Sequence, residues 1–82
     1  MIGFAEAVHR ELGRARGVHG PIRSPHEGYA VVLEEVRELE KDIFDRRRPW
    51  PDAAKELVQV AAMCQRMAED LNWLEMIAAR EH

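Results

Sequence analysis

The chain has 82 residues, of which 46% are hydrophobic, and a formal net charge of -3 at pH 7. These values indicate one folded domain, residues 1–82, and the acidic balance argues against nucleic acid as the main partner. No apolar run is long enough to span a bilayer and no signal peptide is evident, while the single cysteine, Cys64, excludes an intrachain disulfide. We therefore expect a cytoplasmic protein that gains stability by forming a homo-oligomer.

The first predicted helix covers residues 2 to about 16, where Phe4, Ala5, Val8 and Leu12 recur at helical spacing. The segment that follows, GVHGPIRSP, contains two glycines and two prolines. Because these residues interrupt regular structure, we expect a loop between the first helix and the second.

The second predicted helix begins at a strong N-terminal signal. We expect Ser24 to be the N-cap, Pro25 to occupy the first helical position, and Glu27 to complete an S-x-x-E capping box. The helix is predicted to run to about Asp45. Its apolar residues form one stripe, which is the face expected to be buried: Tyr29, Val32, Leu33, Val36, Leu39 and Ile43.

The third predicted helix follows the break RRRPWP and covers about residues 51 to 71, with Pro51 in its first turn. Asn72 either caps or kinks it, and WLEMIAAREH either continues it or forms a short fourth helix. Strand signals are absent, so the predicted class is all-α, an antiparallel hairpin within a bundle of three to four helices. The stripe expected to be buried on the third helix comprises Ala53, Leu57, Val60, Ala61, Cys64, Met67, Ala68 and Leu71.

Acidic residues lie beside both apolar stripes. Helical spacing places Glu35, Glu38 and Asp42 on one flank of the second helix, and Glu56 and Gln59 on the corresponding flank of the third. If the two helices pair antiparallel, these flanks face each other. Gathered carboxylates repel one another, and a hard divalent cation such as Mg²⁺, or Mn²⁺ in its place, relieves that repulsion.

The alternative is an ordinary solvated face. Arg37 and Lys41 stand three or four residues from Glu34, Glu38 and Glu40, at spacings that form ion pairs along a helix. Spacing by itself favours this alternative, because charge runs on short helices are usually solvated.

Two longer sequence motifs favour a metal site over a solvated face. EEVRE, residues 34–38, is followed by ELVQ, residues 56–59, and the pair resembles the E-E-x-x-E and E-x-x-D motifs of the MazG-type all-α nucleoside triphosphate pyrophosphohydrolases. The flanking words HEGYAVVLEEVREL and AAKELVQVAAM are similar to a short, phage-like branch of that group. The resemblance covers His26 to Leu71, which is most of the chain.

The resemblance implies a reaction and a set of site residues. Glu35, Glu38 and Glu56 match metal-ligand positions, Glu34 matches the first glutamate of E-E-x-x-E, and Gln59 stands where the family has aspartate. The implied reaction is hydrolysis between the α- and β-phosphates of a nucleoside triphosphate, which gives a monophosphate and pyrophosphate. We take Glu38 as the general base, and we expect the neutral Gln59 to weaken metal binding.

Several further residues have two possible roles. Lys41, Lys55 and Arg66 are near enough to the acidic flanks to contact phosphate, with Lys41 and Lys55 as candidate substrate contacts, but each is also typical of a surface cation. Arg46–Arg48 could screen a triphosphate or form a solvated loop cluster. Cys64 is expected to be a buried core thiol.

The two tryptophans are expected to pack. Trp50, between two prolines, is predicted to anchor the turn, and Trp73 is predicted to lie at a subunit interface.

Two functions from different classes follow. One is a Mg²⁺-dependent pyrophosphohydrolase that removes unwanted nucleotides. The other is a catalytically silent MazG-like oligomer that binds a nucleotide or metal or has a structural role, which the departure at Gln59 motivates. A DNA-binding module is disfavoured, because basic residues do not gather along one helix.

Overall fold

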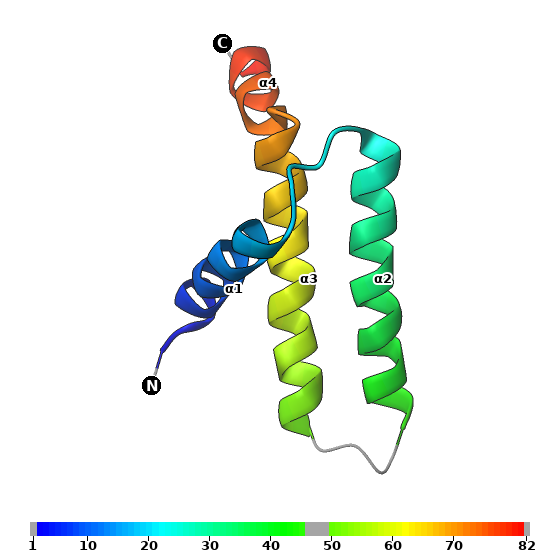
Figure 1. The fold of residues 1–82 in the computed structure, drawn as a ribbon. Helices are drawn as coiled ribbons and strands as arrows, with labels where there is room; N and C mark the ends of the chain where they lie inside the picture. Colours follow the sequence, from blue (N-terminus) through cyan, green and yellow to red (C-terminus); the bar gives the residue numbers. More distant parts are fainter. Residues whose placement is uncertain (1, 46–49, 82) are drawn as a thin grey trace.

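The computed structural model describes residues 2–45 and 50–81, and over these ranges it confirms the all-α prediction. Figure 1 shows α2 and α3 side by side and antiparallel, with α1 crossing α3 and α4 extending beyond its end. No helix in the described ranges is both long and apolar enough to cross a membrane. The four helices are α1 (Phe4–Val18), α2 (Pro25–Phe44), α3 (Trp50–Asp70) and α4 (Trp73–Arg80).

The predicted cap of α2 is confirmed. The Ser24 hydroxyl accepts a hydrogen bond from the Glu27 N–H at 3.1 Å, and Pro25 lies in the first turn. The Glu27 carboxylate accepts from the N–H of Arg23 at 3.1 Å, rather than from that of Ser24 as in a standard capping box. The reciprocal bond therefore ties the preceding loop to the helix.

The end of α3 settles the two alternatives for the C-terminal segment. Asn72 adopts a left-handed conformation, with φ 60° and ψ 29°, and α4 begins at the next residue, Trp73. Asparagine tolerates this conformation better than most residues, because its short polar side chain can bond locally. The segment is therefore a short fourth helix.

The core lies where α1 crosses α3. Val8, Leu12 and Ala15 from α1 pack with Ala62 and Met63 from α3. Partly buried apolar residues from α2 and α3 extend this cluster: Val31, Val32, Val58 and Ala61.

Helix α2 approaches the Met67 side chain of α3 closely at Gly28. A Cβ atom built there would lie 2.6 Å from the Met67 Cγ and 2.7 Å from its Sδ. The absence of a side chain at Gly28 therefore allows α2 to approach α3 at this level.

Both predicted stripes are partly wrong. On α2, Tyr29, Val36 and Ile43 are exposed, whereas Gly28 and Asp42 are buried. The buried face of α2 is thus rotated away from the centre of the apolar stripe, toward the acidic flank. The reason is that α2 contacts only α3 among the described helices, so a wide stripe cannot be covered completely.

The same is true of α3, where Leu57 and Cys64 are exposed. Cys64 is therefore not a core thiol. Ala53 is buried as predicted. The other buried residues of α3 lie outside the predicted stripe, because α1 and α2 cover other sides of the helix: Ala62, Met63 and Arg66.

Neither tryptophan is a core residue. Trp50 is 69% exposed, and the turn that it was predicted to anchor lies outside the described residues, so that role stays a prediction. Trp73, at the start of α4, is 36% exposed, and its predicted interface role stays a prediction.

Candidate functional site

The antiparallel pairing of α2 and α3 brings Glu35, Glu56 and Gln59 into contact. With its nitrogen turned inward, the Gln59 amide donates hydrogen bonds of 3.0 Å to Glu35 Oε2 and 3.0 Å to each carboxylate oxygen of Glu56. With its oxygen turned inward instead, the Gln59 oxygen meets three carboxylate oxygens without a donor between them, and only a proton or a cation stabilises such an arrangement. The amide orientation of Gln59 thus decides whether the cluster is closed or open to a cation.

We call Glu35, Glu56 and Gln59 the acidic cluster. This cluster lies in a region of excess negative charge. The pKa of Glu56 is raised from 4.5 to about 7, mainly by partial burial and next by its hydrogen bond to Glu35. The negative charges of Glu35, Asp42 and Glu38 add to the effect. Near neutral pH the cluster therefore holds a carboxyl that a bound cation would help to ionise.

The donor atoms fit a hard divalent ion, since all of them are oxygens. Within residues 2–45 and 50–81, however, no three His, Cys, Asp or Glu side chains gather as a ready set of metal ligands. An ion held by Glu35 and Glu56 would therefore also use the Gln59 carbonyl oxygen. Replacing a carboxylate by an amide lowers the charge of the site, and hence its affinity for Mg²⁺.

Glu38 lies on the edge of this arrangement. Its carboxylate is 3.4 Å from the Lys41 ammonium, and both side chains are largely exposed. They line a separate hollow of about 400 Å³ on α2, together with Glu34 and Arg37. Glu34 lines both this hollow and a larger cleft between α1, α2 and α3. Lys41 lines the hollow but not that cleft.

Lys55 is exposed on α3 and lines neither of these two concave sites. Its positive charge helps to lower the pKa of Glu11, although the hydrogen bond from Arg14 to Glu11 is the main cause. The two lysines predicted as substrate contacts are thus not brought together at the cluster.

A cleft of about 580 Å³ opens beside the acidic cluster, between α1, the loop of residues 19–24, α2 and α3. Its α2 wall is acidic, with Glu27, Glu34 and Glu35. Arginine side chains lie on the other walls. The charged and polar residues that line the cleft are Glu11, Arg14, His19, Arg23, Glu27, Glu34, Glu35, Gln59 and Arg66.

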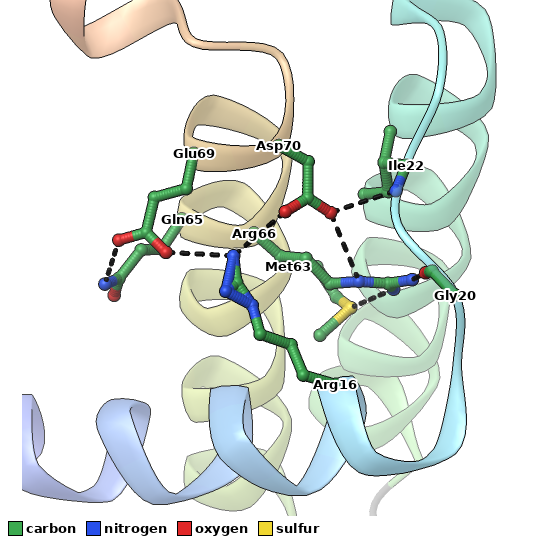
Figure 2. A network of polar contacts seen from close by, with 8 residues as sticks. All are labelled: Arg16, Gly20, Ile22, Met63, Gln65, Arg66, Glu69 and Asp70. Carbon is green, nitrogen blue, oxygen red and sulfur yellow. Dashed lines mark hydrogen bonds and ion pairs between the residues drawn. The ribbon is translucent and has the colours of Figure 1, made fainter.

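The sequence left two roles open for Arg66, a phosphate contact or an ordinary surface cation. Arg66 is only 4% exposed, so the surface-cation alternative is wrong, and the phosphate contact stays a prediction. Its guanidinium donates to the Gly20 carbonyl oxygen at 2.6 Å and to the Met63 sulfur at 3.6 Å. Figure 2 shows the side chain reaching from α3 to the loop that forms one wall of the cleft.

Asp70, one turn further along α3, organises the surrounding polar contacts in Figure 2. One of its oxygens accepts from the Ile22 N–H at 2.9 Å, and the other from Arg16 at 3.0 Å. Arg16 also donates to Glu69 at 2.9 Å, so this network joins the end of α1 and the loop to α3. In the sequence, the i,i+4 spacing of Arg66 and Asp70 indicates an ion pair on one helix, which is the local part of this network.

Comparison of the chain with protein-family models, with curated proteins and with solved structures found no match. The MazG-type assignment therefore stays a prediction from the EEVRE and ELVQ words. The three arginines Arg46–Arg48, predicted either to screen a triphosphate or to be solvated, lie outside the described residues.

Proposed function

We propose that the protein is a Mg²⁺-dependent nucleoside triphosphate pyrophosphohydrolase of MazG type. The observation that carries the proposal is the contact of Glu35, Glu56 and Gln59 across α2 and α3, at the wall of a cleft with cations on its other sides. A triphosphate needs both features, because its phosphates bind cations and its metal binds carboxylates.

The residues have distinct proposed roles. Glu35, Glu56 and the Gln59 oxygen would hold Mg²⁺ or Mn²⁺, with Glu38 as a further ligand or as the general base that accepts a proton from water. A bound divalent ion supplies charge neutralisation at phosphate and a lower pKa for the attacking water. The ionised form of Glu56 is needed for this, so metal binding should strengthen as the pH rises through about 7.

A panel of ribonucleoside and deoxyribonucleoside triphosphates with Mg²⁺ tests the activity, with pyrophosphate as the readout. We expect turnover of at least one nucleotide and its loss in Glu35→Ala. The matched control is Glu6→Ala, since Glu6 is an exposed residue of α1 that pairs with Arg10. Absence of pyrophosphate from every nucleotide would contradict the catalytic proposal.

A catalytically silent nucleotide- or metal-binding protein is the second candidate. The closed form of the acidic cluster favours it, because the Gln59 amide can satisfy Glu35 and Glu56 without any ion. Calorimetric titration with Mn²⁺ separates the two. Binding that Glu35→Ala abolishes, without turnover, supports a sensor; no binding at all supports a structural role.

We also propose that two copies pair through a face of α2 and α3. At 100° per residue, Tyr29 lies about 140° around α2 from Glu34, and Leu57 lies about 160° around α3 from Gln59. The exposed apolar rows therefore point away from the cleft. They repeat every seven residues, Tyr29–Val36–Ile43 on α2 and Leu57–Cys64 on α3, as in helices that pack along a seam.

Light scattering at micromolar concentration tests this pairing. We expect a homodimer or homotetramer, and dissociation in Val36→Glu, because a carboxylate buried in an apolar seam is strongly unfavourable. Arg10→Glu, on the outer surface of α1, is the control. A monomeric wild-type protein would contradict the proposed pairing without bearing on the chemistry of the cleft.

A further inference from the structure

Arg66 is a buried cation whose hydrogen-bonding capacity is only partly used. A guanidinium has five N–H donors, and here one bond goes to the Gly20 carbonyl and another to the thioether of Met63, which is a weak acceptor. The buried Nε of Arg66 has no hydrogen-bond partner among the described residues.

The nearest carboxylate does not supply the missing hydrogen bond to Arg66 Nε. Asp70 Oδ2 lies 3.9 Å from the Arg66 Nε, beyond hydrogen-bond distance, and already accepts from the N–H of Ile22. The other oxygen of Asp70 accepts from Arg16. Leaving buried donors of a charged group unfilled is unfavourable, and an anion that fills them is correspondingly stabilised.

Arg66 lines the cleft, and it also lines a smaller hollow of about 250 Å³ together with Arg16 and Asp70. Gln59, Met63 and Arg66 follow one another on the same side of α3 and all line the cleft. Two helical turns separate Gln59 from Arg66, which is about 10 Å along the axis. The acidic cluster and the buried cation thus lie at separate places along one wall.

Two more cations stand at the same cleft. Arg14 on α1 and Arg23 in the loop both line it and are exposed. Arg14 is bonded to Glu11 at 2.9 Å, so its charge is partly compensated, whereas no carboxylate of the described residues lies within hydrogen-bond distance of Arg66. Arg66 therefore has the less compensated charge of the two, and it is also the more buried.

We infer that Arg66 binds the phosphate chain of the ligand, which extends from there along the cleft toward Glu35 and Gln59. Planar guanidinium donors match the oxygens of a phosphoryl group, and the site has room for a phosphate chain. The choice of a nucleoside triphosphate as the source of that chain rests on the proposed function. The anion site itself needs no metal, which allows the two to be tested apart.

Inorganic tripolyphosphate in buffer with EDTA is the probe, and isothermal titration calorimetry is the measurement. We expect the wild-type protein to bind it, and Arg66→Met to lose at least tenfold in affinity. Arg10→Gln is the matched control, because Arg10 is an exposed arginine outside the cleft. Unchanged binding by a folded Arg66→Met variant, or no binding by the wild type, overturns the inference.

Two further variants cover the case in which Arg66→Met fails to fold. Arg66→Lys keeps the charge but loses the planar donors, so we expect severalfold weaker binding. The pair Arg14→Gln and Arg23→Gln changes exposed side chains only, and together these substitutions should weaken binding about threefold and reduce its salt dependence. Wild-type affinity in both Arg66→Lys and the double variant would overturn the inference.

Turnover separates this inference from the proposed function. Arg66-dependent binding of tripolyphosphate without any nucleotide hydrolysis supports the anion site and contradicts the enzyme. Hydrolysis that persists with unchanged KM in Arg66→Lys, together with unchanged tripolyphosphate binding, supports the enzyme and overturns the anion site.

Discussion

Two polar regions of α3 differ in charge balance. Around Asp70, carboxylates and guanidinium groups alternate, and Arg16 contacts two carboxylates at 2.9 and 3.0 Å. Around Glu56, the neighbours that alter its pKa are all acidic, and among the described residues it is the neutral Gln59 amide that can donate to the cluster and close it. The ion pairs of Arg16 with Asp70 and Glu69 compensate opposite charges without a ligand, whereas the acidic cluster is stabilised best by a proton or a ligand.

Breaking the balanced network should have the largest effect. Asp70→Ala removes the acceptor of the Ile22 N–H and an ion-pair partner of Arg16, and it leaves Arg66 without its nearest carboxylate. We expect the free energy of unfolding in urea to fall by about 2 to 4 kcal/mol. The control, Glu6→Ala, should change it by less than about 0.5 kcal/mol. Equal effects in the two variants would mean that the network around Asp70 does not hold the loop.

A substitution in the acidic cluster should instead raise the free energy of unfolding. Since the pKa of Glu56 is raised from 4.5 to about 7, its contribution to stability is complete below the lower value and is lost as the pH rises through the higher one. Glu56→Gln should remove this loss. We therefore expect the variant to gain on the order of 1 kcal/mol over the wild type between pH 5 and pH 8, after solvent screening. Urea unfolding at several pH values measures the difference, and a gap that does not change with pH contradicts it.

A further carboxylate in the acidic cluster should increase the difference in charge balance between this cluster and the network around Asp70. Gln59→Glu removes the donor between Glu35 and Glu56 and adds a third carboxylate. Without metal we expect a loss of roughly 1 kcal/mol at pH 8, and with Mg²⁺ roughly tenfold tighter binding. Gln65→Glu is the matched control, because Gln65 bonds to Glu69 within the balanced region. Mg²⁺ binding that weakens in Gln59→Glu would exclude a cation at this cluster.

The smallest effect is expected at Lys41. Its ion pair with Glu38 is largely exposed, so Lys41→Ala should change the free energy of unfolding by less than about 0.5 kcal/mol. Because Lys41 lines the hollow on α2 and not the cleft, the KM for a nucleotide should change less than about twofold. A tenfold rise in KM would restore Lys41 as a substrate contact and move the ligand to that hollow.

The helices and their pairing were predictable because their signals are local. Ser24 and Pro25 mark the start of α2, and residues with low helix propensity separate the segments, so the boundaries differ from the prediction by about two residues at most. Antiparallel pairing then follows from a short connection between two amphipathic helices. The proximity of Glu35 to Glu56 and Gln59 is a consequence of that pairing, and it was predicted on the same grounds.

Which side of each helix is buried was decided only in the tertiary structure. Periodicity gives a face only to within a broad apolar stripe. Among the described helices α2 contacts α3 alone and cannot bury all of its stripe, whereas the helices packed on α3 cover other sides of it. The approach of α2 at Gly28 and the crossing of α1 over α3 selected Met63 and Arg66 as buried and left Val36 and Cys64 exposed. Arg66 became buried because the loop supplies the Gly20 carbonyl, an acceptor 46 residues away that no local pattern encodes.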